Sequence, residues 1–110
     1  MQRGEVFRLR APKDPRGHEQ GGSRYGVVVQ ADELLGLSTV IVVPTSTRSL
    51  PASFRPEVEI AGRTTRVLVE QLGAVDPRRL GESHGLLGFD ELRAVDRAIA
   101  LVVGLDVGIS

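Results

Sequence analysis

The chain has 110 residues, enough for the single domain that we expect over residues 1–110, and 41% of them are hydrophobic, which suffices for a compact core. The absence of cysteine excludes disulfides and thiolate zinc sites, and with only two histidines a histidine metal site is not expected. A net charge of zero argues against a protein that coats nucleic acid by bulk charge, because such proteins carry a basic excess.

Positive charge is nevertheless concentrated near the N-terminus. Residues 1–30 contain only three acids, and the excess of basic side chains there predicts a local basic face. The basic residues are Arg3, Arg8, Arg10, Lys13, Arg16, Arg24 and, when protonated, His18.

No segment has the features of a signal peptide or of a membrane span. Residues 1–20 are polar and contain two prolines, and no apolar run approaches the roughly 18 residues that a membrane helix needs. We therefore expect a cytoplasmic protein without a membrane partner.

The first third of the chain predicts two strands separated by a long loop. Arg3 to Leu9 alternates polar and apolar residues, which is typical of a strand. Residues 11–23 hold two prolines and three glycines, so we expect an irregular loop, and loops of this length are often functional. Tyr25 to Gln30 predicts a buried strand, and Ala31 to Leu35 a single helical turn.

The middle of the chain predicts more strands. Thr39 to Val43 is a continuous β-branched run, which favours a central strand, and Pro44 is expected to end it because proline cannot donate to the ladder. A polar loop follows over residues 45–49. The further strands are expected at Glu57 to Ile60, which a turn at residues 61–63 follows, at Thr65 to Leu72, and briefly at Leu86 and Leu87.

The last segment changes its period. Leu92, Val95, Ile99 and Val102 recur at three- and four-residue spacing, which predicts an amphipathic helix from about Asp90 to Leu105. Several short strands followed by one helix predict a mostly β fold with a C-terminal α-helix, in which the helix packs on a small barrel.

Two segments have residues suited to binding an anion. Arg24 directly precedes an apolar strand, where it is either an anion clamp or a solvated strand-end arginine. Ser46 follows the central strand and either forms a turn or binds and orients a substrate. No nucleophile motif of a serine hydrolase surrounds it.

Other candidates are titratable residues. His18 and Glu19 lie side by side in the long loop, and a histidine there is either an acid–base catalyst or simply exposed. Glu70 and Gln71 interrupt an apolar strand, and their spacing does not decide whether they point into a cleft. Four aromatic residues are too few to support a module that stacks RNA bases on aromatic pairs.

The order of these segments resembles the MazF/PemK (Kid-like) toxins over essentially the whole chain. The opening matches at residues 3–7 (RGEVF), at Asp14-Pro15, and at residues 17–24 (GHEQ-x-G-x-R). A strand that ends in Val-Pro-Thr-Ser-Thr at residues 43–47 resembles the second motif. Glu70-Gln71-Leu72, with Asp76 and Arg79-Leu80, resembles the third.

This resemblance implies a CcdB/PemK-type, SH3-like barrel that forms a two-fold dimer. It further implies the toxin of a type II toxin–antitoxin system, which cleaves single-stranded RNA at short sequences and thereby inhibits translation and growth. Members of the MazF/PemK family leave a 2′,3′-cyclic phosphate and a 5′-hydroxyl, and they need no metal or other cofactor. The implied partners are the RNA, a second copy of the chain, and a cognate antitoxin with a disordered acidic tail.

The resemblance also assigns site residues. Arg24 matches the family's main catalytic arginine, and Ser46 falls where the MazF branch has a catalytic threonine. His18 and Glu70 fall on the catalytic histidine and aspartate of the Kid branch. Leu68 replaces that branch's catalytic arginine, so we favour Arg24 as acid and phosphate clamp. The expected RNA-binding residues are Glu19, Gln20, Thr45, Thr47, Arg48 and Gln71.

Two alternatives stay open. CcdB-like toxins have the same barrel and poison DNA gyrase without cutting, but the chain's ending, Val107-Gly108-Ile109-Ser110, lacks the Trp-Gly-Ile of those proteins. The other alternative is an inactive, structural relative.

Overall fold

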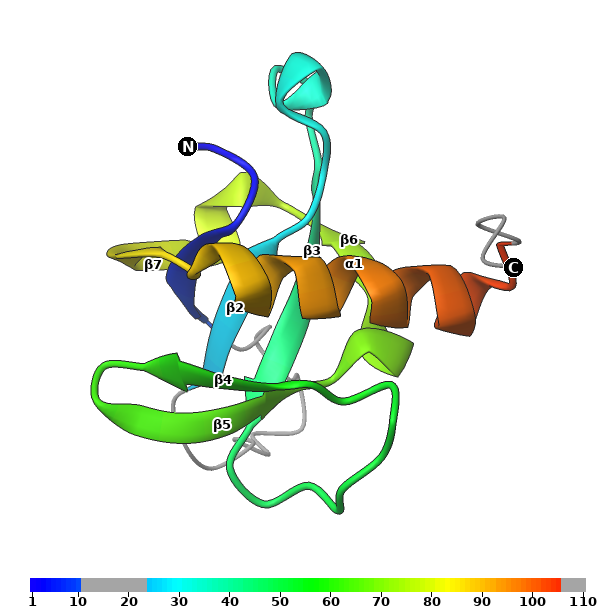
Figure 1. The fold of residues 1–110 in the computed structure, drawn as a ribbon. Helices are drawn as coiled ribbons and strands as arrows, with labels where there is room; N and C mark the ends of the chain where they lie inside the picture. Colours follow the sequence, from blue (N-terminus) through cyan, green and yellow to red (C-terminus); the bar gives the residue numbers. More distant parts are fainter. Residues whose placement is uncertain (11–23, 106–110) are drawn as a thin grey trace, which may run out of the picture.

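The computed structural model describes residues 1–10 and 24–105. These residues form a curved antiparallel sheet with one long helix across it (Figure 1). Short 3-10 turns η1 (Asp32–Leu34), η2 (Val69–Gln71) and η3 (Pro77–Arg79) connect some of the elements. The strands are β1 (Glu5–Leu9), β2 (Arg24–Val28), β3 (Val40–Ser46), β4 (Glu57–Ile60), β5 (Arg63–Val67), β6 (Gly73–Val75) and β7 (Leu80–Leu86), and the helix is α1 (Phe89–Val103).

The strands are ordered β4-β5-β3-β2-β1-β7, and β6 pairs with β3 beside this path. In Figure 1, α1 crosses the sheet between β7 and the β4–β5 hairpin, so the curved sheet wraps one side of the helix. The predicted mostly β fold with a C-terminal helix is therefore confirmed. Among the described residues, no helix is long and apolar enough to cross a membrane.

The core is built mainly from valines. One cluster fills the space between the sheet and α1, and a smaller cluster of Phe7, Val28, Val40 and Val42 covers the other face of the central strands. β-branched residues suit this role because they pack well on a pleated sheet. The larger cluster comprises Val6, Val27, Val29, Val43, Val58, Ile60, Val67, Val69, Leu87, Val95 and Ala98.

The terminal helix begins and ends close to its predicted limits. Gly88 is its N-cap, and its backbone N–H donates to the Glu91 carboxylate at 2.9 Å. The same carboxylate accepts from the N–H of Glu59 at 2.7 Å, which ties the start of α1 to β4. Gly104 ends the helix in the left-handed conformation, with φ of 75°.

The prediction that Pro44 ends the central strand is wrong, because β3 continues to Ser46. Val40 to Val42 pair with β6, whereas Thr45 and Ser46 pair with β5. Pro44 lies where β3 passes from one partner to the other, and its carbonyl accepts from the N–H of Leu68 at 2.8 Å. A missing N–H is tolerated at such a junction.

The predicted strand from Thr65 to Leu72 is also wrong in its second half. β5 ends at Val67, and the chain then turns through η2 before β6 begins. Val67, Leu68 and Val69 are all buried, which alternation along one strand would not allow. The single helical turn expected at Ala31 to Leu35 is confirmed as η1.

The strand that the sequence predicts at Leu86 and Leu87 is much longer in the structure and begins earlier. β7 covers Leu80–Leu86, and it pairs with β1 in a register that shifts twice.

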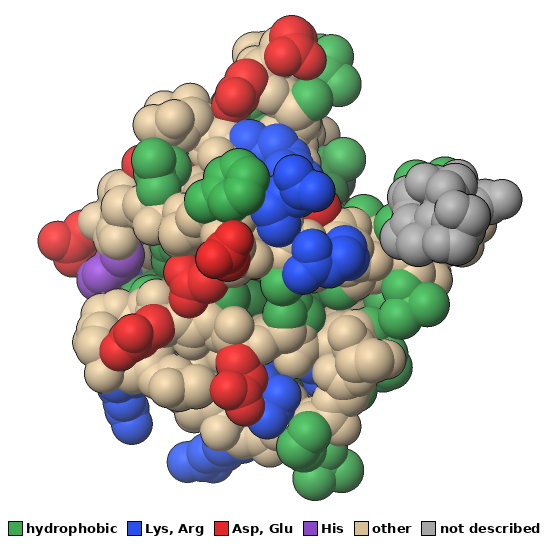
Figure 2. All heavy atoms as spheres, viewed as in Figure 1, with side chains coloured by type: hydrophobic (Ala, Val, Ile, Leu, Met, Phe, Trp, Pro, Cys, Tyr) green, Lys and Arg blue, Asp and Glu red, His purple; other side chains and the backbone are tan. Residues whose placement is uncertain are grey.

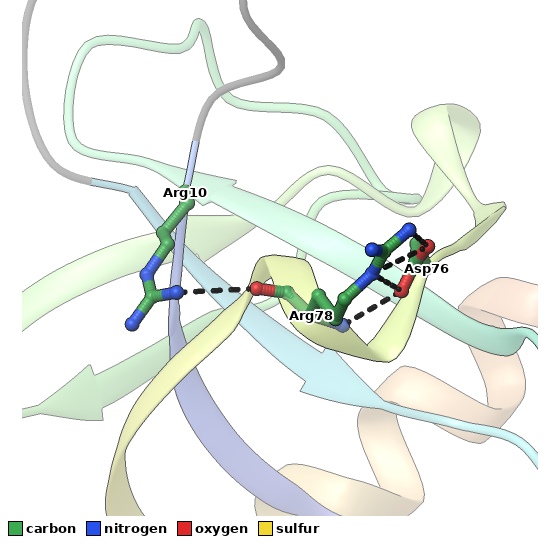
Figure 3. Close-up of polar contacts among 3 residues, drawn as sticks. All are labelled: Arg10, Asp76 and Arg78. Atoms are coloured by element: carbon green, nitrogen blue, oxygen red, sulfur yellow. Dashed lines mark hydrogen bonds and ion pairs between the residues drawn. The ribbon is translucent and has the colours of Figure 1, made fainter.

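Hydrogen bonds also hold the segment just before β7. Arg10 donates to the carbonyl of Arg78 at 3.3 Å, as Figure 3 shows. The Arg78 guanidinium and backbone N–H donate to Asp76, and these bonds lower the pKa of that carboxyl to about 2. The end of β1 is thus fixed to η3.

Candidate active site

One open cavity of about 810 Å³ lies at the end of the sheet where β2 and β5 begin and where β3 and β4 end. A cavity of this size suits a ligand larger than a single phosphate group. The described residues that line it are Arg8, Arg24, Tyr25, Thr45, Ser46, Thr47, Arg48, Ile60, Arg63 and Thr65. The structure therefore brings together five residues predicted for the site: Arg24, Thr45, Ser46, Thr47 and Arg48.

No described residue compensates the positive charge in this cavity. None of its four arginines makes a side-chain hydrogen bond or ion pair with another described residue, and no described acid lines the cavity. Four arginines elsewhere are paired with carboxylates at 2.6–2.7 Å: Arg3, Arg55, Arg66 and Arg78. Although the net charge of the chain is zero, the cavity concentrates guanidinium groups that have no partner among residues 1–10 and 24–105, and such groups suit an anion.

The two hydroxyl residues on β3 differ in their contacts. Thr45 is buried, and its Oγ1 accepts from the backbone N–H of Tyr25 at 3.3 Å, which joins β3 to β2. Ser46 is half-buried, and its Oγ accepts from the N–H of Arg48 at 3.1 Å, as the turn interpretation predicts. That bond uses Ser46 only as an acceptor, so its own hydrogen is available to a bound oxygen.

The sequence did not single out an aromatic group at one wall. Arg8 on β1 lies opposite Tyr25 on β2, and the Arg8 guanidinium carbon is 5.7 Å from the centre of the Tyr25 ring. His84 on β7 contacts the same ring edge to face, with ring centres 4.9 Å apart and planes at 78°. The Nε2 of His84 is buried and has no partner among the described residues. Only the pairing of three strands brings these residues together.

Arg63 on the opposite wall was also missed as a site residue. It faces Ile60 across the two-residue turn of the β4–β5 hairpin, in which Ala61 and Gly62 have φ of 53° and 76°. Both φ values are positive, as in the turns that match the twist of a hairpin. Ile60 and Arg63 both line the cavity.

The structure does not bring Glu70 or Gln71 to this cavity. Both lie on η2, where Glu70 accepts two hydrogen bonds from Arg55, at 2.7 and 3.0 Å. These bonds lower the pKa of Glu70, so its carboxylate is ionised at neutral pH. A carboxylate in this state cannot act as a general acid.

Three predicted site residues, His18, Glu19 and Gln20, lie outside the described residues. Within residues 1–10 and 24–105, no group of three or more histidine, aspartate or glutamate side chains could hold a metal ion. What the described cavity can do chemically is bind an extended anion and donate hydrogen bonds to it.

Comparison with known families identifies the chain. The model of the PemK-like, MazF-like toxins of type II toxin–antitoxin systems matches residues 2–103. The chain belongs to this family. A Mycobacterium tuberculosis protein named "Putative toxin" is 41% identical over 104 residues, which are 94% of this chain and 97% of that protein.

Solved structures of the same fold agree with the architecture. An endoribonuclease from a Mycobacterial species, solved in complex with its cognate antitoxin, has a TM-score of 0.78 at 17% identity, over 96% of this chain and 97% of that one. MazF from Deinococcus radiodurans has a TM-score of 0.77 at 24% identity, over 94% and 96%. At these identities the likeness concerns the fold, and it confirms the predicted barrel with its terminal helix.

Proposed function

We propose that the protein is an endoribonuclease that cleaves single-stranded RNA without a metal ion, and that the four-arginine cavity is its active site. The observation that carries this proposal is the set of four guanidiniums, without a partner among the described residues, that line one cavity together with the Ser46 hydroxyl. The names of the structural relatives support the same activity, since they include endoribonucleases and MazF toxins.

The reaction needs little from the protein. The ribose 2′-oxygen attacks the adjacent phosphorus, the bond to the 5′-oxygen of the next nucleotide breaks, and the products are a 2′,3′-cyclic phosphate and a 5′-hydroxyl. One proton leaves the 2′-oxygen and one reaches the 5′-oxygen. Because the substrate supplies the nucleophile, the enzyme has only to stabilise the additional charge on the phosphorane and move these protons.

The residues of the cavity suit these tasks. Arg24 is exposed at the start of β2, where its guanidinium can bind two phosphate oxygens and protonate the leaving oxygen. Ser46 can donate a hydrogen bond to the same phosphate. Thr47 and Arg48 would contact the neighbouring RNA. Roles for His18, Glu19 and Gln20 stay predictions.

We further propose that the protein acts as a homodimer and is inhibited by a cognate antitoxin with an acidic tail. An acidic segment would be attracted to the four arginines of the cavity, as the RNA backbone would be. One structural relative was solved with its cognate antitoxin, which supports such a partner.

Cleavage of single-stranded RNA by purified Arg24 variants in excess EDTA tests this proposal. The native protein should cleave, and Arg24→Ala should lose roughly 10²–10³ in rate, as expected on removing a preorganised charged donor. Arg24→Lys should fail nearly as badly, because a point charge cannot bind two oxygens as the planar guanidinium does.

Arg97→Ala is the matched control, since Arg97 is exposed on α1 and does not line the cavity. It should cleave at the native rate. If the native protein cuts no RNA and instead stops DNA gyrase, the CcdB-like alternative is correct. If it does neither, the protein is an inactive relative of the family.

A further inference from the structure

We infer that Arg8 and Arg63 bind the phosphates on either side of the one that is cut, so that the substrate must present at least three consecutive phosphates. This inference rests on the proposed function, and it assigns specific residues to substrate positions beyond the reacting one. The evidence for it is the position of the two guanidiniums and the contacts that hold them in place.

Arg8 and Arg63 lie on opposite walls of the cavity. Along the sheet, β5, β3, β2 and β1 are consecutive neighbours, with Arg63 on β5 and Arg8 on β1. Three steps between neighbouring strands amount to roughly 14 Å measured along the sheet. Arg24 lies on β2, between these two positions. A single phosphate cannot span such a cavity, whereas a nucleic-acid strand with repeated phosphates can.

Arg8 is held in place by aromatic packing. Its guanidinium lies over the Tyr25 ring at 5.7 Å, a cation–π contact, and His84 supports the edge of that ring. Arg8 is itself exposed and makes no ion pair with a described acid. A contact of this kind keeps the guanidinium on its wall and leaves its N–H groups free for a phosphate.

Arg63 is held by the hairpin. It is the first residue after the turn at Ala61 and Gly62, and it is paired with Ile60, whose side chain is buried. This pairing fixes the backbone from which Arg63 reaches the cavity. Arg66 on the same strand differs, because Glu57 binds it at 2.6 Å and it does not line the cavity.

The test measures binding of uncleavable single-stranded RNA in which every ribose carries a 2′-O-methyl group. The probes are one of two nucleotides, with one phosphate, and one of four nucleotides, with three, of the same central sequence. The native protein should bind the longer probe much more tightly. In the double variant Arg8→Gln/Arg63→Gln this advantage should disappear, while binding of the short probe changes little.

Salt dependence provides a second measurement. Each lost phosphate contact should reduce the slope of log affinity against log salt by about 0.7 for a single strand. Arg8→Gln and Arg63→Gln should each show this change with a longer probe, and Arg97→Gln should not. In cleavage assays the two variants should raise KM with kcat nearly unchanged.

Variants of Tyr25 separate the positioning of the Arg8 guanidinium from its charge. Tyr25→Phe keeps the ring beneath Arg8 and should bind like the native protein, whereas Tyr25→Leu should resemble Arg8→Gln. If Arg8→Gln and Arg63→Gln keep the native length and salt dependence, as Arg97→Gln should, the inference is wrong even though RNA cleavage by the native protein stands. Absence of cleavage by the native protein would instead remove the proposed function on which the inference rests.

Discussion

At the scale of single residues, Thr45 and Ser46 have the same functional group and opposite tasks. Thr45 is buried and satisfies the Tyr25 N–H, so its hydroxyl serves the fold. Ser46 is partly exposed at the cavity, and water can replace its bond to the N–H of Arg48. The two positions therefore allow a matched pair of substitutions.

Ser46→Ala should lower kcat by about tenfold, because a hydrogen bond of about 1.4 kcal/mol to the reacting phosphate is lost. Its melting temperature should stay near the native value, and Ser46→Thr should restore the rate. Thr45→Val should instead lower the melting temperature, because the Tyr25 N–H loses its acceptor. A Ser46→Ala protein that keeps the full rate would show that the hydroxyl only forms the turn.

Glu70 provides the contrasting case. Because Arg55 holds it ionised and away from the cavity, Glu70→Gln should cleave at close to the native rate. Kinetics with Glu70→Gln, His18→Ala and Arg24→Ala in parallel would separate the two branches of the family. Loss of cleavage in Glu70→Gln or His18→Ala, with Arg24→Ala still folded and active, would favour the Kid-type assignment.

The sequence reveals those site residues that are local to a motif. Arg24 and the segment Thr45 to Arg48 each stand beside a recognisable strand, and the structure places both at one cavity. Arg8, Tyr25 and Arg63 could not be found in this way. Their positions depend on which strands are neighbours and in what register, and composition contains no information about either.

At the scale of elements, the structure explains why the first motif, residues 3–7, has a glycine at position 4. Its φ is 90°, its N–H donates to the carbonyl of Val28 at 2.7 Å, and its carbonyl accepts from Leu87 at 3.0 Å. A Cβ built at Gly4 would lie 3.0 Å from Leu92 on α1. The residue thus joins β1 to β2 at a point where a side chain would crowd Leu92.

Gly4→Ala should destabilise the protein by about 1–2 kcal/mol from the backbone conformation alone, with the contact to Leu92 adding to it. Urea unfolding is the measurement, and Gly36→Ala is the control. Gly36 is exposed, has no atom within 4 Å of its built Cβ, and has no positive φ. Equal stability of the two variants would contradict the role assigned to Gly4.

The elements that were predicted well have strong local patterns. The period of α1 and the β-branched run of β3 are visible without tertiary information, and both are observed. β7 has no such pattern, since residues 80–86 read LGESHGL and all of them are exposed or half-buried. It is a strand because β1 offers it an edge, and long-range pairing of this kind overrides local preference.

At the scale of the whole molecule, exposed apolar side chains gather at the end of α1. Leu101, Val102, Val103 and Leu105 are 36–62% exposed, and Figure 2 shows hydrophobic side chains at this end of the helix. Such a patch on a small protein favours self-association.

We expect a dimer at micromolar concentration, measured by sedimentation. Leu101→Glu should shift the protein towards monomer without unfolding it. Leu37→Glu is the matched control, because Leu37 is 58% exposed against 59% for Leu101 but lies far from the end of α1 in the chain. A native protein that sediments only as monomer would contradict the proposed dimer.

The most direct test of the whole account is the end groups left on one short RNA cut by the native protein in excess EDTA. The account predicts a 2′,3′-cyclic phosphate and a 5′-hydroxyl, and no cut when the ribose at the cleavage site is 2′-deoxy. Cleavage that disappears in EDTA and returns with added magnesium, or that persists at a 2′-deoxy site, would contradict it.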